Sequence, residues 1–128
     1  MTMIVIDTHI FIWIFSCPTK LTAKAVKAMA EAEKLIIPSI VLWETAMLAS
    51  RDRITLPRPW SAWLKQACKQ PGFQIQPITP DIAVLSATME MHRDPADRLV
   101  VATAKALGLP LITVDGAIRD AGLVSTIW

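Results

Sequence analysis

The stretch Met3-Ile4-Val5-Ile6-Asp7-Thr8-His9 decides the fold class. An apolar run rich in β-branched residues precedes a single carboxylate, which is typical of a short strand that is buried on both faces and ends at Asp7. Such strands belong to parallel sheets covered by helices. Asp7 then stands where these sheets bind ligands, just beyond the carboxyl end of a strand.

The rest of the chain alternates between strand and helix patterns. Further strands are predicted at residues 35–37, 73–78, 111–114 and 124–128, and helices at 9–15, 21–34, 40–50, 60–69, 80–91, 95–107 and 117–121. Thr8 and Ser39 are predicted to cap the helices that follow them, and residues 51–59 to form a loop with at most a short strand at 54–56. This alternation predicts an α/β fold, a three-layer α/β/α single domain over residues 1–128 with a central, mostly parallel sheet.

Composition excludes several classes of protein. Of 128 residues, 53% are apolar and 19% charged, which excludes intrinsic disorder. No uncharged apolar run is long enough to span a membrane, and the N-terminus lacks the features of a signal peptide. Cys17 and Cys68 fit neither a disulfide framework nor a metal motif, so we expect a reduced, cytoplasmic protein. A net charge of +2 is too small to indicate nucleic-acid binding by itself.

Four carboxylates stand where folding alone does not require them. Asp7 and Asp115 each follow a four-residue apolar run, although an aspartate at a strand exit is also a common turn former. Glu44 lies on an otherwise apolar helix, where it either marks the solvated edge, pairs with an arginine, or is buried and needs a cation or hydrogen bonds. Asp97 follows Asp94 and Pro95 at a helix start, where capping and the helix dipole also explain both acids.

A cluster of such carboxylates needs compensation. Like charges a few ångströms apart raise each other's pKa or bind a hard divalent cation, and oxygen ligands suit Mg²⁺ or Mn²⁺. His9 and His92 are isolated in the sequence and lack zinc spacing. An acidic pocket that holds Mg²⁺ or Mn²⁺ suits phosphodiester hydrolysis, because the metal orients the phosphate and lowers the pKa of the attacking water.

Four segments, at residues 4–9, 39–44, 94–99 and 111–115, resemble the motifs of the PIN-domain family, and most closely those of VapC-type toxins. The resemblance implies a PIN-like fold and a Mg²⁺- or Mn²⁺-dependent endoribonuclease that acts on RNA. It also implies a cognate antitoxin that inserts a segment near the acidic site. It assigns the family's catalytic, metal-binding acids to Asp7, Glu44, Asp97 and Asp115. Thr113 matches a hydroxyl residue beside the last acid, Asp94 fits the flank of the third motif, and His9 and Trp13 match a frequent pattern to which we assign no catalytic role.

Basic and aromatic residues give weaker signals. Arg51 and Arg53, on the loop after the Glu44 helix, are with Thr113 the candidate substrate-binding residues, although ordinary solubilising charge is the more common reason for such arginines. The tryptophans Trp43, Trp60 and Trp63 are predicted to serve the core or an interface rather than base stacking. So apolar a chain is expected to form a homodimer and to be covered by a partner.

Other classes of protein fit less well. A phosphotransfer receiver domain needs a pair of acids after the first strand, whereas Thr8 and His9 follow Asp7. A dinucleotide-binding domain needs a glycine-rich loop there, and the chain has only four glycines. A non-catalytic PIN-like RNA-binding or scaffolding protein remains an open alternative, which predicts binding without metal-dependent cleavage.

Overall fold

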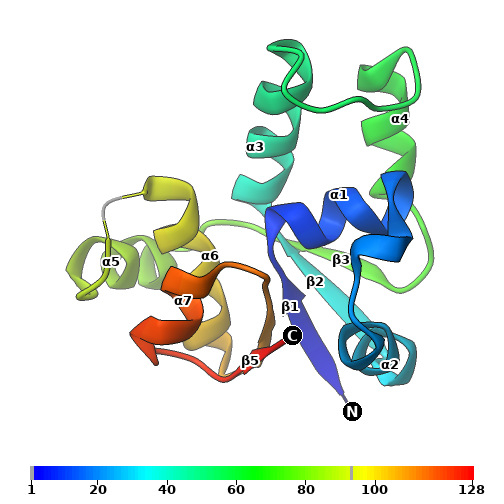
Figure 1. The fold of residues 1–128 in the computed structure, drawn as a ribbon. Coiled ribbons are helices and arrows are strands. Elements are labelled where there is room, and N and C mark those ends of the chain that lie inside the picture. The colour runs from blue at the N-terminus through cyan, green and yellow to red at the C-terminus, as the bar shows by residue number, and fades with distance from the viewer. Residues whose placement is uncertain (1, 93) are drawn as a thin grey trace.

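The computed structural model describes residues 2–92 and 94–128. Its centre is a five-stranded sheet in the order β3-β2-β1-β4-β5, in which every neighbouring pair is parallel. The strands are β1 (Met3–Ile6), β2 (Lys34–Pro38), β3 (Phe73–Gln76), β4 (Leu111–Ile112) and β5 (Thr126–Ile127). The predicted first strand is therefore the middle of the sheet, and the predicted parallel arrangement is confirmed (Figure 1).

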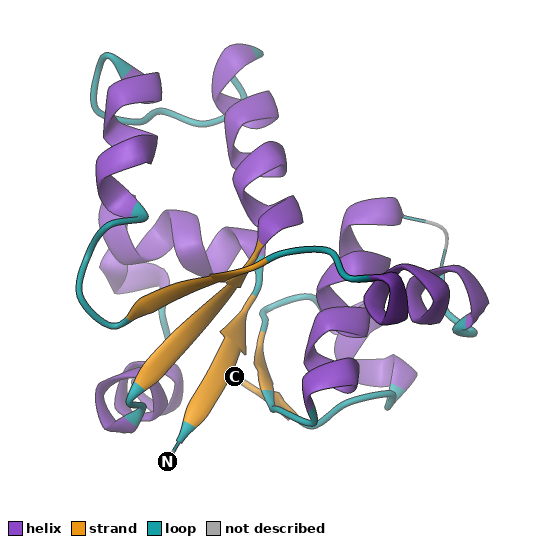
Figure 2. Ribbon diagram, turned by 180° about the vertical axis from the view of Figure 1, so that it is seen from behind, coloured by secondary structure: helices purple, strands orange, loops and turns teal. Residues whose placement is uncertain are grey.

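Helices cover both sides of this sheet, as predicted. They are α1 (Thr8–Ser16), α2 (Ala23–Glu31), α3 (Ser39–Ser50), α4 (Trp60–Ala67), α5 (Pro80–Thr88), α6 (Pro95–Leu107) and α7 (Gly116–Ala121), with a 3-10 turn, η1, at Pro18–Lys20. Figures 1 and 2 show α5, α6 and α7 grouped on one side, α1 and α2 on the other, and α3 and α4 extending beyond the sheet. No helix in the described part of the chain is long and apolar enough to cross a membrane.

Two helix caps differ from the prediction. Asp7, and not Thr8, caps α1: its Oδ1 accepts a hydrogen bond of 2.7 Å from the Thr8 backbone N–H. Ser39 is likewise the first helical residue of α3, and the cap position falls on Pro38. The reason is the same in both places. Each strand runs directly into its helix without a loop, so the cap position falls one residue earlier than expected.

The predicted boundaries of α6 are confirmed. Asp94 accepts a 3.1 Å hydrogen bond from the Asp97 backbone N–H at the start of the helix. Gly108 ends the helix in the left-handed conformation, with φ of +66°, which glycine adopts without strain.

Other elements are shorter than the sequence pattern predicts. The strand predicted at 111–114 ends at Ile112, because β1 leaves the sheet at Asp7 and removes one of its two pairing partners. The helix predicted at 21–34 covers only Ala23–Glu31, since Lys34 already pairs with Met3 as the first residue of β2. The three elements predicted at 60–69, 73–78 and 80–91 each end earlier, the strand predicted at 124–128 reduces to two residues, and no strand forms at 54–56.

An aromatic cluster anchors α1 to the sheet and to α4. Phe11 is completely buried, and its ring centroid lies 5.6 Å from that of Phe15 and 6.3 Å from those of Trp63 and Phe73. The predicted core role of Trp63 is therefore confirmed. Trp43 is different: it is 57% exposed, which excludes the core for this side chain.

Phe11→Ala tests the importance of this cluster for stability. Removing a fully buried phenylalanine should lower the free energy of unfolding by about 3–5 kcal/mol, because transfer and cavity terms add. Urea unfolding monitored by circular dichroism measures this. Val84→Ala, at a position that is 64% exposed, is the control and should change stability by less than about 0.5 kcal/mol. Similar urea midpoints for both variants would contradict the assignment of Phe11 to the core.

Candidate active site

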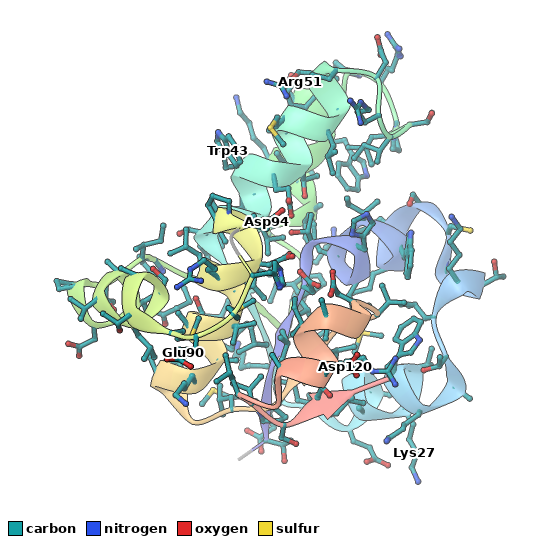
Figure 3. All side chains as sticks on the ribbon, turned by 60° about the vertical axis from the view of Figure 1, so that its left-hand side comes forward. Lys27, Trp43, Arg51, Glu90, Asp94 and Asp120 are labelled. Atoms are coloured by element: carbon teal, nitrogen blue, oxygen red, sulfur yellow. The ribbon has the colours of Figure 1, made fainter. Side chains whose placement is uncertain are left out.

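The predicted acids meet in one cavity of about 390 Å³, where the carboxyl ends of β1 and β4 face α3 and α6. The cavity is lined by Asp7, His9, Trp13, Glu44, Asp94, Asp97, Val114 and Asp115. All four acids singled out from the sequence are among them, together with the flanking Asp94. Figure 3 shows Asp94 at the start of α6, close to the flank of α3 that carries Trp43.

Asp7 is the most buried of these acids, with 5% of its surface exposed. Its Oδ2 accepts a 2.6 Å hydrogen bond from the Thr113 hydroxyl, and its Oδ1 accepts the bond from the Thr8 N–H. Burial raises the pKa of Asp7 above its usual value, and the two hydrogen bonds oppose this shift. The carboxylate is thus held in one orientation at the edge of the central strand.

Thr113 connects two of the acids. Its hydroxyl donates to Asp7 and accepts a 3.1 Å hydrogen bond from the Asp115 backbone N–H. Asp115 in turn caps α7 by accepting a 3.0 Å bond from the Ile118 N–H. The prediction that Thr113 contacts the substrate needs correction, because its side chain is completely buried and engaged with Asp7. Its place in the structure is that of a positioning residue.

Glu44 projects from α3 and is half-buried at the wall of the cavity. Burial raises the pKa of its carboxyl, and nearby Asp7 and Asp94 add to the shift. None of the ion pairs among the described residues involves Glu44, so the structure provides no arginine partner for it. The Thr8 hydroxyl is also buried here and has no hydrogen-bond partner within the described part of the chain.

Asp97 makes a contact that the sequence reasoning missed. Its Oδ2 lies 2.8 Å from His92 Nε2, and its side chain is 20% exposed. Burial raises the pKa of Asp97 to about 6; the His92 hydrogen bond opposes this shift, and the nearby acids Asp94, Asp7 and Asp115 add to it. The view of His92 as isolated is therefore wrong. The available signal was its position five residues before Asp97, across the turn that starts α6.

His92 is held in place by a second residue that the sequence analysis did not single out. The Arg98 guanidinium donates hydrogen bonds of 2.6–3.2 Å to four backbone carbonyls, those of Ser86, Met89, Met91 and His92. These carbonyls belong to the end of α5 and the segment after it. Arg98 therefore fixes the path of the segment that brings His92 to Asp97.

The predicted substrate-binding arginines lie elsewhere. Arg51 and Arg53 are exposed at the end of α3 and do not line the cavity. Seven residues separate Arg51 from Glu44, which places it about 10 Å further along the helix axis. Figure 3 shows Arg51 at the end of α3 remote from Asp94.

The side chains that line the cavity are of the kind that bind a hard divalent cation. Its acidic side chains are all carboxylates, and three of them, Asp7, Glu44 and Asp97, have pKa values raised chiefly by burial, with smaller contributions from neighbouring acids. As the described side chains stand, no group of three or more acids, histidines or cysteines surrounds a common point. Magnesium does not require such a cage, because it usually keeps several waters and binds one or two carboxylates together with substrate phosphates. The residues present therefore fit this class of ion.

Comparison with known proteins identifies the family. The PIN domain family matches residues 4–123, which is nearly the whole chain. This chain belongs to the PIN-domain family. Among curated proteins, the PIN-domain chain is 34% identical over 122 residues to Ribonuclease VapC22 of Mycobacterium tuberculosis (strain ATCC 25618 / H37Rv), covering 94% of this chain and 92% of that protein.

Solved structures show the same PIN fold. VapBC2 from Rickettsia felis, bound to a DNA fragment from its promoter, matches with a TM-score of 0.70 and 13% identity over 98% of this chain and 97% of its own. VapC20 of Mycobacterium tuberculosis, a Sarcin-Ricin loop cleaving toxin, matches with a TM-score of 0.66 and 17% identity over 94% of this chain and 96% of its own. FitAcB from Neisseria gonorrhoeae matches with a TM-score of 0.64 and 22% identity over 96% of this chain and 95% of its own. The predicted PIN-like three-layer fold is confirmed.

The raised pKa of Asp97 predicts how stability depends on pH when no metal is bound. Because its folded pKa of about 6 exceeds the ordinary value of 3.8, the unfolded chain loses this proton first as pH rises. The free energy of unfolding therefore falls between roughly pH 4 and pH 6, and the full penalty is present above pH 6. Asp97→Asn should then stabilise the protein at pH 7 by at most about 3 kcal/mol, less about 0.3–1 kcal/mol for the lost helix-dipole interaction.

Thermal melts in EDTA at pH 4 and pH 7 measure this effect, which should nearly vanish at pH 4. Asp81→Asn is a matched control, because Asp81 lies in the first turn of α5 and is exposed. It should lose only the dipole interaction. An Asp97→Asn protein that melts below wild type at pH 7 would show that capping outweighs charge repulsion at this position.

Proposed function

We propose that this PIN-domain protein is a metal-dependent endoribonuclease of the VapC type, the toxin of a toxin–antitoxin pair, which cleaves RNA phosphodiester bonds at its carboxylate cavity. The observation that carries the proposal is the meeting of Asp7, Glu44, Asp97 and Asp115 in one cavity at the edge of the sheet. The 34% identity to a named ribonuclease over nearly the whole chain supports the reaction type.

The four acids would hold Mg²⁺ or Mn²⁺. A bound ion would orient the scissile phosphate and would lower the pKa of the attacking water. The chain's own contribution is to prepare the ligands. Thr113 and the Thr8 N–H fix Asp7, while His92 holds Asp97 Oδ2. Such partners of metal ligands commonly set both affinity and activity.

Asp97 also links metal binding to pH. With a pKa of about 6, its carboxyl carries a proton below this pH and must release it to become an anionic ligand. His92 Nε2 lies within hydrogen-bond distance of this carboxyl, 2.8 Å from Oδ2. We therefore expect metal affinity to fall as pH drops below about 6.

Cleavage of RNA is the direct test. The purified protein, freed of any partner, should cut RNA with Mg²⁺ or Mn²⁺ and stop when EDTA is added. Removing a residue that only positions a metal ligand typically lowers activity about 10- to 100-fold. Asp7→Asn and Asp97→Asn alter the proposed ligands themselves, so each should lose more activity than this. Gel analysis of a mixed RNA pool provides the measurement, with circular dichroism to confirm the native fold.

Asp120→Asn is the matched control, because Asp120 is an exposed acid on α7 outside the cavity (Figure 3). It should cleave like wild type. Undiminished cleavage by both cavity variants would sink the carboxylate-site hypothesis. RNA binding without any cleavage would favour the non-catalytic alternative.

The surface beside the acids suits an antitoxin. A hollow of about 450 Å³ adjoins the carboxylate cavity and shares Glu44 and Asp94 with it. Its remaining lining is apolar, from Ile40, Trp43, Met47, Pro95 and Ala96. A partner segment that carries apolar side chains next to a basic one would match both surfaces. The solved relatives from Rickettsia felis and Klebsiella pneumoniae are toxin–antitoxin complexes. A homodimer remains our expectation from the apolar composition.

Growth of a bacterial host tests the toxin assignment. Expression of the wild type alone should arrest growth, whereas Glu44→Gln and Asp115→Asn should relieve the arrest because each removes a charge from the metal site. Colony counts after induction, at matched protein levels on immunoblots, provide the readout. Equal toxicity of these variants and the parent would remove both residues from the proposed site.

A further inference from the structure

The carboxylate cavity has an aromatic wall that the proposed chemistry does not use. His9 and Trp13 line it alongside the acids. They stand four residues apart on α1, so both project from one face of this helix, and their ring centroids are 5.7 Å apart. His9 is exposed and lines the same cavity as Asp7 and Glu44.

Two residues outside α1 lie next to the Trp13 ring. Its ring centroid lies 6.1 Å from that of Trp128 at the end of the chain, and the Lys20 Nζ lies 5.4 Å from the Trp13 centroid. Trp13 is also partly buried and packs against the hydrophobic core. It is thus a partly exposed aromatic side chain that lines the cavity together with the acids and has a lysine ammonium group near its ring.

This arrangement matches the parts of a nucleotide strand. A phosphate is attracted to a metal ion among the acids and to an ammonium group, and a base stacks on an aromatic ring. Aromatic platforms act on unpaired nucleotides, because bases inside an RNA duplex are already stacked and only single strands, loops and bulges expose their faces.

We propose that His9 and Trp13 form a stacking surface for a nucleobase next to the scissile phosphate, with Lys20 contacting a neighbouring backbone phosphate. This inference rests on the proposed ribonuclease function and adds the position of the base to it. A protein segment seated on the same wall is the alternative that the test must exclude.

Binding of a short, labelled single-stranded RNA of random sequence tests the proposal without cleavage. The assay uses fluorescence anisotropy in Ca²⁺, with a gel to show that the RNA stays intact. Trp13→Leu should weaken binding about 5- to 150-fold, the equivalent of one stacked base. Trp13→Phe should retain most of the affinity. An RNA backbone of the same length without bases should bind wild type and Trp13→Leu equally.

Lysine variants separate stacking from charge. Lys20→Ala should weaken binding and reduce its dependence on salt, because one phosphate contact is lost. Lys27→Ala is the matched control, since Lys27 is an exposed lysine on α2 that pairs with Glu31, and it should bind like wild type. His9→Ala, at an exposed position, should weaken binding several-fold and covers the case in which Trp13→Leu does not fold.

Several outcomes overturn the proposal. One is unchanged RNA affinity in a folded Trp13→Leu or in His9→Ala. Another is an equal loss for the base-free backbone. A third is loss of affinity in Trp43→Leu but not in Trp13→Leu, which would move the stacking surface to α3. Failure of the proposed function looks different: wild type then leaves RNA intact with Mn²⁺, whatever Trp13 contributes to binding.

Discussion

The hydrogen bond from the Thr113 hydroxyl to Asp7 Oδ2 is the contact on which the site depends. It joins the ends of β1 and β4, two neighbouring strands separated by most of the chain. A buried carboxylate is costly unless it is hydrogen-bonded, so this pairing makes it tolerable to end the central strand in an acid. Because the same hydroxyl accepts from the Asp115 N–H, one side chain sets the positions of two of the four acids.

The crowding of acids is balanced in part by the helices around them. Asp7, Asp94 and Asp115 are the N-cap residues of α1, α6 and α7, so the amino ends of three helices point at the cavity. The partial positive charge at a helix start favours nearby carboxylates. This compensation is incomplete, since the pKa of Asp97 is still raised to about 6. The turn and cap roles of these acids and their place in the cavity are therefore two aspects of one arrangement.

The fold follows from a pattern rather than from particular residues. Three solved structures with the same fold are only 13–22% identical to this chain, yet they match it with TM-scores of 0.64–0.70. Short apolar strands that alternate with helices allow few parallel arrangements, because crossovers are right-handed and both sheet faces must be covered. The acids at the strand ends then meet at one edge whatever the identity of the core residues.

The sequence by itself determined the succession of strands and helices along the chain, the buried first strand, and the position of Asp7 and Asp115 at the ends of strands. These features depend on hydrophobic periodicity, which is local and reports which side of each element is buried. Only the tertiary structure placed His92 against Asp97, buried Thr113, set Arg51 and Arg53 apart from the cavity and made Trp13 its wall. Such contacts depend on the direction of helices and the path of the segments between them. Arg98 fixes one such path through four backbone carbonyls, and no periodicity in the sequence encodes which carbonyls an arginine reaches.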